Sequence, residues 1–318
     1  MTQEHTHAAV LPTAPAKRYY KTPGVRLLSD FSGKGKKSYI LLEADNIEAY
    51  LKWQKAEGSP KFSGHASRKE RSNNSWDLGA GWAGAQKLLS DGWPEGVAKL
   101  KTAVAALPSS VGFGRIPDSD VCGDSLNIPA FVAGDPCHWD CDPDEDASLG
   151  QTKVIRLVVP VGAYAYFSAS HLYNRGAAVV ACVRSIEAAG YQCEVVAESG
   201  ADGGGSSDPV ICQRVVVKHA GCSLDLNNLA VWIAHPAIFR RLFFAGREGL
   251  WDVQLPNGGN VRGSLGGYGG TCYGPTDGLQ AGTIYLPLAA HGNHHTPKDS
   301  LDTLAKVFKD AGFLLKFN

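Results

Sequence analysis

An apolar stretch near the middle of the chain constrains the fold most. Residues 154–159 (VIRLVV) are apolar at nearly every position and rich in β-branched side chains, which is typical of a buried strand. A predicted helix follows, with Asn174 as its N-cap and Gly190 at its end, and a second apolar run begins directly afterwards. This strand–helix–strand unit predicts an α/β sheet.

The C-terminal half repeats this pattern. The sequence predicts strands at residues 210–218 and 283–288, and a helix after residue 224 that is interrupted at Pro236. A final amphipathic helix is expected to start at Thr296 and to end before Gly312. We therefore predict a three-layer α/β domain over residues 151–318, with helices on both faces of its sheet.

The N-terminal half is expected to be smaller and mainly helical. Its predicted parts are a flexible basic arm at residues 1–35 and a mainly helical region with an acidic loop at residues 36–150. Within that region we expect a strand at 38–42, a helix at 46–55 capped by Asp45, and helices at 81–90 and 94–107. Trp76, Trp82 and Trp93 are interpreted as core anchors, with base stacking as the alternative.

The charge and cysteine content of the chain limit which partners and which cellular compartment the sequence predicts. The chain has 31 basic and 31 acidic residues, so the whole protein offers no electrostatic argument for nucleic acid or an anionic membrane. Its first 75 residues are nevertheless basic, which favours either a solvated arm or a site for nucleic acid or an acidic partner. Eight scattered cysteines, with no apolar leader or membrane-length run, indicate a cytoplasmic protein that does not enter a membrane.

Two short motifs raise the question of a metal. Cys137, His138 and Cys141 have a spacing found among zinc ligands, with Cys122 as an additional candidate. The acidic run at residues 140–148 lacks the glycine and terminal glutamate of a calcium-binding EF-hand loop. We interpret this region as a solvated acidic linker before the α/β half, and such a linker could also lie against the basic N-terminal region.

A second histidine-rich motif lies near the C-terminus. His291, His294 and His295 are candidate metal ligands together with Asp299 or Asp302, or candidate bases for the thiol of Cys272. The alternative is that they are ordinary surface residues of a loop. We expect no resident cofactor, and a divalent metal is the one cofactor that these motifs leave open.

The half of the chain from Val154 onward resembles a von Willebrand factor A-type domain. That family has a central sheet with helices on both sides and an Asp-x-Ser-x-Ser metal motif after the first strand. The matching place here reads Tyr166-Phe167-Ser168-Ala169-Ser170. Ser168 and Ser170 are present and the aspartate is not, so the resemblance implies a degenerate metal position and metal-independent contact.

The whole chain also resembles an uncharacterised family encoded by bacteriophages and mobile elements. The matching segments are residues 92–96 (GWPEG), 132–136 (VAGDP), 174–195 and 224–242. This resemblance implies the cytoplasm of a bacterial host or association with a virion, and it implies no chemistry.

These observations predict a non-enzymatic binding or assembly protein of a bacteriophage or mobile element. It would recognise a protein partner through loops at one end of an A-type-like sheet, where recognition sites on rigid scaffolds are common. One alternative is a metal-assisted hydrolase or nucleic-acid-processing enzyme that uses the C-terminal histidines. Another is nucleic-acid binding through the basic N-terminal region.

Overall fold

The computed structural model describes residues 22–30, 38–56, 77–107, 111–115, 118–120, 125–141, 154–162, 168–202, 209–250, 270–276, 279, 282–288 and 294–317. The main strands are β1 (Val25–Asp30), β2 (Tyr39–Ala44), β7 (Val154–Pro160), β8 (Gln192–Asp202), β9 (Val210–Lys218), β10 (Gly270–Cys272) and β11 (Thr283–Tyr285). The longer helices are α1 (Ile47–Ala56), α3 (Gly81–Asp91), α4 (Pro94–Ala105), α6 (Ala169–Ala188) and α10 (Pro297–Asp310).

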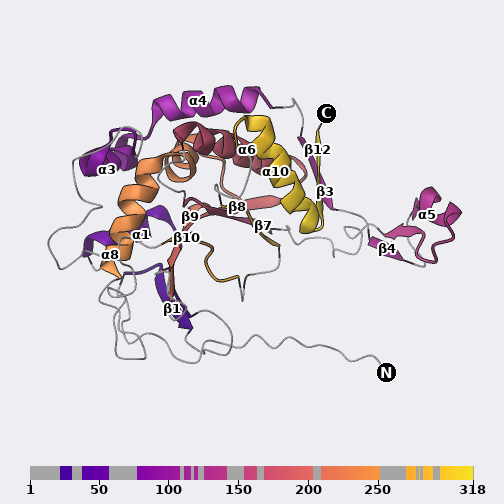
Figure 1. Ribbon diagram of the computed structural model, residues 1–318, viewed down its shortest axis with the longest axis horizontal. Helices are drawn as coiled ribbons and strands as arrows, with labels where there is room; N and C mark the ends of the chain where they lie inside the picture. The colour runs from indigo at the N-terminus through magenta and orange to yellow at the C-terminus, as the bar shows by residue number, and fades with distance from the viewer. Residues whose placement is uncertain are drawn as a thin grey trace.

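These strands form one mixed sheet. Six of them follow the order β1-β2-β9-β8-β7-β11, and β10 pairs with β8. Strands β8, β7 and β11 are mutually parallel, whereas β9 runs antiparallel to β8. Helices flank the sheet, and the N-terminal region is more helical, so the predicted α/β class is confirmed (Figure 1).

The sheet draws its strands from both halves of the chain. Strand β2 pairs with β9 in parallel, and β1 pairs with β2. Strand β1 lies inside the predicted arm, and β2 lies inside the predicted helical region. The predicted boundaries at residues 35 and 150 therefore run through a single sheet.

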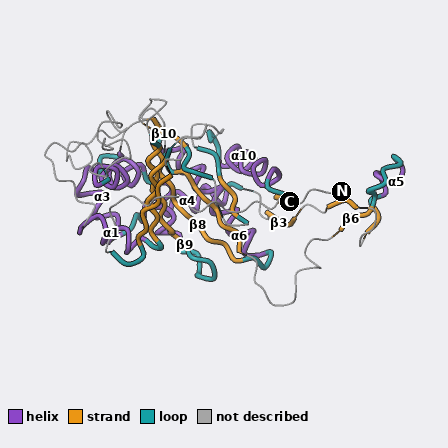
Figure 2. Tube along the Cα trace, turned by 90° about the horizontal axis from the view of Figure 1, so that it is seen from below, coloured by secondary structure: helices purple, strands orange, loops and turns teal. Residues whose placement is uncertain are grey.

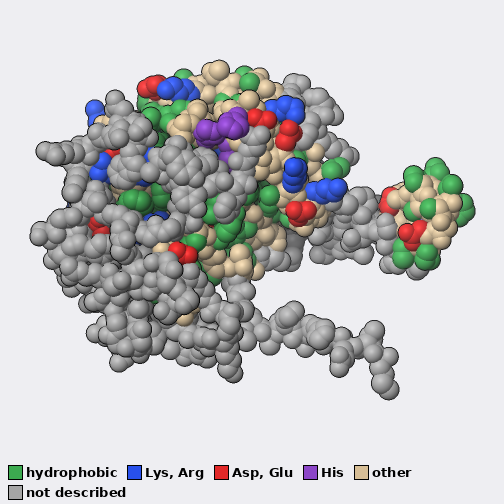
Figure 3. All heavy atoms as spheres, in the orientation of Figure 1, with side chains coloured by type: hydrophobic (Ala, Val, Ile, Leu, Met, Phe, Trp, Pro, Cys, Tyr) green, Lys and Arg blue, Asp and Glu red, His purple; other side chains and the backbone are tan. Residues whose placement is uncertain are grey.

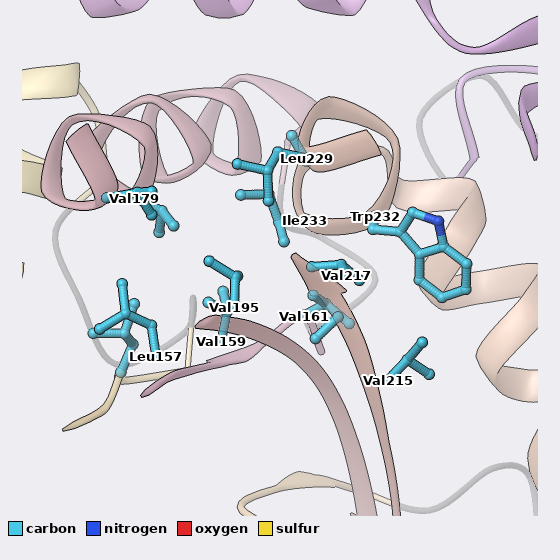
Figure 4. Packing of buried hydrophobic residues seen from close by; sticks show 14 of the residues in the cluster. Leu157, Val159, Val161, Val179, Val195, Val215, Val217, Leu229, Trp232 and Ile233 are labelled. Carbon is cyan, nitrogen blue, oxygen red and sulfur yellow. The ribbon is translucent and has the colours of Figure 1, made fainter. Parts of the chain in front are cut away.

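The largest core lies between the sheet and helices such as α6. Leu157, Val159 and Val161 point to this core from β7 and the residue after it, and Val179 packs there from α6 (Figure 4). Val158 belongs to a separate small cluster with Val196 and Val216. Because alternate residues of a strand point to opposite faces, this division shows that β7 is buried on both faces.

Helix α6 begins earlier than the sequence predicts. It starts at Ala169 with Ser168 as its N-cap, so Asn174 lies inside the helix and the prediction of an Asn174 cap is wrong. Gly190 follows the end of the helix with a φ of +86°, which only glycine adopts without strain, as predicted. The correction moves the helix N-terminus close to the end of β7.

Other predicted elements hold with small changes. The side chain of Asn46, not of Asp45, accepts the capping bond in α1, from the backbone N–H of Ala49. The helix around Pro236 is interrupted there, with π-helices η1 (Ala230–Ala234) and η2 (Ile238–Phe243) on either side, joined to α7 (Leu226–Leu229) and α8 (Phe244–Gly249). Thr296 caps α10 in a reciprocal capping box with Asp299.

The acidic region contains structure where only a loop was expected. Strands β4 (Asp118–Asp120), β5 (Ser125–Leu126) and β6 (Trp139–Cys141) form a small antiparallel sheet in the order β4-β6-β5. Helix α5 (Ile128–Val132) joins β5 to β6. A second small sheet pairs β3 (Val111–Arg115) with β12 (Phe313–Phe317).

Within the described residues, no helix combines the length and apolar character needed to cross a membrane.

Trp93 is buried against Tyr173 and His235, which supports its predicted role as a core anchor.

Candidate site at the strand ends

The candidate site lies where β7 and β11 end and α6 begins. Strands β7 and β11 are parallel neighbours, so their carboxyl ends meet at one edge of the sheet. The chain leaves β7 through α6 to β8 on one side, whereas β11 lies on the other side of β7 and leads to α10. Such points of divergence are where ligands bind in open α/β sheets. Histidine side chains gather on the surface in this part of the molecule (Figure 3).

A chain of short polar contacts runs across this edge. The hydroxyl of Ser168 lies 2.8 Å from the Ser170 hydroxyl and 2.5 Å from Nδ1 of His171. Nε2 of His171 lies 3.2 Å from Nδ1 of His295, which precedes α10. Although Ser168 is the N-cap of α6, its side chain makes no capping bond, because its hydroxyl is turned to the imidazole. Ser168, Ser170 and His295 are exposed to solvent.

Two side chains of α6 hold the segments of this site together. The buried guanidinium of Arg175 donates to the carbonyl oxygen of Pro160 at 2.8 Å and to that of Pro287 at 2.7 Å. It thereby bridges the ends of β7 and β11. The side-chain amide of Asn174 donates to the carbonyl oxygens of His294 and His295 at 2.9 and 2.8 Å. The position of His295 beside His171 therefore depends on Asn174.

The site is electropositive beneath its surface. Arg175 is 1% exposed and forms no salt bridge with any acidic group in the described part of the chain. Burial lowers its pKa to about 10, which still leaves it charged at neutral pH. The N-terminus of α6 adds the positive end of a 20-residue helix dipole.

His294 is the buried member of the histidine group, at 1% exposure. Its Nδ1 lies 2.9 Å from the Ser300 hydroxyl, and its Nε2 has no hydrogen-bond partner among the described residues. Burial, assisted by the charge of Arg175, lowers the pKa of His294 to about 3. Burial and the neighbouring His295 also lower the pKa of His171. The imidazole of His294 is therefore neutral at pH 7.

A second polar cluster lies on the other face of the sheet. Buried Glu198 accepts a bond of 2.8 Å from Nε of Arg214, and it also accepts from the backbone N–H of Gly274 and from the hydroxyl of Tyr285. Burial raises the pKa of Glu198, opposed by the charge of Arg214. Each charge has a partner, so this cluster is best explained as a structural ion pair.

Cys272 belongs to that other face. It packs beside Leu41, Val210 and Cys212, whereas alternate residues of β2 and β9 belong to the large core cluster, which also contains the buried residues of α6. The predicted pairing of Cys272 with His294 or His295 therefore lacks support within the described residues. His291 lies outside them.

The remaining metal candidates among the described residues lie in or just before β6. Nδ1 of His138 hydrogen-bonds to the backbone oxygen of Asp135, 2.6 Å away, and Cys137 precedes β6. Cys141 is the last residue of β6, and Cys122 lies outside the described residues. Across the described ranges, no three His, Cys, Asp or Glu side chains gather as a metal-binding group.

The structure thus unites Ser168, Ser170, His294 and His295, which two separate sequence motifs proposed. Sequence reasoning missed His171, Asn174 and Arg175 as site residues. The signal for them was available: once α6 starts at Ala169, these three residues lie within its first two turns.

Comparison with known protein families places residues 35–314 in a family described as a domain of unknown function, DUF7192. The chain belongs to that family. No curated protein and no solved structure matches the chain.

Proposed function

We propose that this chain is a binding protein that recognises a carboxylate or phosphate group of a partner protein at the strand-end site. The observation that carries the proposal is Arg175, a buried guanidinium with no acidic partner in the described residues, at the joined ends of β7 and β11. Backbone carbonyls stabilise this charge only in part, because they are dipoles and not counter-ions.

The exposed groups of the site also favour an anion. The first turn of α6 lacks a side-chain cap, and its backbone N–H groups and positive dipole together attract carboxylates and phosphates. The hydroxyls of Ser168 and Ser170 and the imidazole of His295 are donors that lie beside that turn. The carboxylate of Asp299 is directed to the cap of α10, where it accepts from the backbone N–H of Thr296.

The A-type resemblance supports the same conclusion from the sequence. In the resembled motif an aspartate precedes the two serines and supplies negative charge for a metal ion. Here Tyr166 occupies that place in the sequence, and a histidine follows the second serine. Losing the carboxylate removes the negative charge that favours a cation, and the imidazole supplies a polar group in its neighbourhood without restoring that charge.

Histidine ring NMR on the full chain tests this proposal. Inorganic phosphate, acetate and a short acidic peptide are titrated separately, with an amide-capped neutral peptide as reference. We expect shifts confined to His171 and His295, and a rise in the pKa of His171, because a bound anion stabilises its charged form. His295→Asn should weaken binding severalfold, whereas His219→Asn, at an exposed histidine outside the site, should not.

The phosphate and carboxylate arms distinguish the two ligand classes. Equal shifts with the neutral peptide, or shifts that His295→Asn leaves unchanged, would contradict anion recognition at this site.

A second candidate function is supported by the 2.5 Å contact between Ser168 Oγ and His171 Nδ1. A nucleophile bonded to a base, which a third group orients, is the signature of covalent hydrolysis. Ser168 Oγ would attack an acyl carbonyl carbon and pass its proton to His171, the leaving group would depart protonated, and water would then cleave the acyl ester.

A fluorophosphonate probe should label Ser168, and labelling should vanish in Ser168→Ala but persist in Ser90→Ala. Absence of labelling in the unmodified protein would eliminate this candidate.

Three further proposals rest on the sequence. They are a bacteriophage or mobile-element origin, a cytoplasmic or virion-associated location in a bacterial host, and nucleic-acid binding through the basic N-terminal region. The support for the first two is the resemblance of the four quoted segments, and the support for the third is the excess of basic residues before Ser75.

A further inference from the structure

A small knob stands apart from the main body of the molecule. It comprises β4, β5, β6 and α5, within residues 118–141 (Figures 1 and 2). Backbone pairing and a helix cap hold the knob together. Strand β6 pairs with both β4 and β5, and Asn127 caps α5 by accepting from the N–H of Ala130. The knob is therefore an organised unit and not a loop.

The apolar side chains of the knob face outward. Leu126 is 41% exposed, Ile128 64%, Phe131 55% and Val132 78%, and α5 has no buried residue. These four account for half of the exposed large hydrophobic residues in the described parts of the chain. Figure 3 shows the knob with much of its visible surface formed by apolar side chains. A contiguous exposed apolar patch of this kind marks an interaction site.

The knob is also strongly acidic. Residues 118–141 contain no lysine or arginine, and their acidic residues are Asp118, Asp120, Asp124, Asp135 and Asp140. An occupant of the knob must therefore combine apolar side chains with positive charge.

One segment of this chain has that composition. Residues 8–21 (AAVLPTAPAKRYYK) contain Val10, Leu11 and two tyrosines, together with Lys17, Arg18 and Lys21, and no acidic residue. We propose that the knob is the docking surface for this N-terminal segment of the same chain. Its apolar residues would cover Ile128, Phe131 and Val132, and its cations would lie against the surrounding aspartates. This inference is independent of the strand-end site.

Photo-crosslinking in the full-length protein tests this docking. A benzoylphenylalanine replaces Phe131, which is exposed, so the substitution places no new bulk in the core. A matched control places the same group at Leu314, an exposed position in β12. We expect crosslinks from position 131, but not from position 314, to map to residues 8–21. Mixing isotopically light and heavy protein should give no mixed crosslinks, because the segment belongs to the same copy as the knob, and predominantly mixed crosslinks would overturn the proposal.

A charge variant supplies the second measurement. Lys17→Glu combined with Arg18→Glu should reduce the crosslink yield severalfold, and raised salt should reduce it in the unmodified protein, because exposed ion pairs are screened. The proposal is overturned if position 131 crosslinks to other parts of the chain or to nothing, or if the charge variant leaves the yield unchanged.

Discussion

Ser168, His171 and His295 show how a site arises from residues that are far apart in sequence. Ser168 and His171 are three residues apart on one helical turn, which brings their side chains to the same face of α6. His295 comes from a segment more than 120 residues later, and the bonds from Asn174 to the backbone of His294 and His295 help to hold it there. A sequence pattern contains the first relation but not the second.

His294 should make the stability of the protein dependent on pH. Its folded pKa of about 3 is below the 6.5 of an unperturbed histidine, so between these values the unfolded chain binds the extra proton. Its contribution is therefore complete above pH 6.5 and is lost as the pH falls toward 3, by about 1.4 kcal/mol for each pH unit. Urea unfolding of the unmodified protein and of His294→Asn should show a stability gap that narrows from pH 7 to pH 5. A stability difference that stays constant between pH 7 and pH 5 would contradict the assignment of this effect to His294. His235, whose pKa is lowered to about 4, titrates equally in both proteins and therefore does not change the difference.

At the scale of elements, the predictions succeeded where local chemistry decides the outcome. Thr296, Pro297 and Asp299 begin α10 through bonds within four residues, and Gly190 and Gly312 end helices by adopting a positive φ. The start of α6 was misplaced because Asn174 is a good N-cap residue by type. Its amide is instead used in a tertiary contact, and Ser168 begins the helix without a capping bond from its side chain.

The acidic region was interpreted as a linker because its proline, glycine and aspartate residues are typical of turns. Its strands are two or three residues long, and such short strands leave no alternating pattern to detect. Exposure of Ile128, Phe131 and Val132 is likewise a tertiary property, because the same residues in a sequence indicate a buried helix face.

At the scale of the whole molecule, a buried ion pair joins the N-terminal helices to the C-terminal half. Asp77, just before α3, accepts two bonds from Arg241 of η2 at 2.9 and 2.7 Å, and both side chains are almost fully buried. Asp77 also accepts from the backbone N–H groups of Gly79 and Gly81. This contact, with the shared sheet, indicates that both halves unfold together.

Replacing Asp77 by alanine tests that cooperativity. The change leaves the guanidinium of Arg241 buried without its carboxylate, which should cost about 3–5 kcal/mol. We expect urea unfolding followed by fluorescence and by circular dichroism to give one coincident transition at lower denaturant. Asp91→Ala, which removes an exposed partner of Lys87, should change stability by less than about 0.5 kcal/mol. Two separated transitions in Asp77→Ala would show that the halves unfold independently.

The sequence by itself determined the α/β class, the helix ends set by caps and glycines, and the type of each chemical group at the strand ends. These follow from interactions between residues close in the chain. The tertiary structure decided which strands share the sheet, because β2 pairs with β9 across more than 160 residues. It also decided that Arg175 joins β7 to β11 and that His295 meets His171. Strand pairing and contacts between distant segments depend on what the folded chain brings together, and the residues of a single segment do not record which partner it meets.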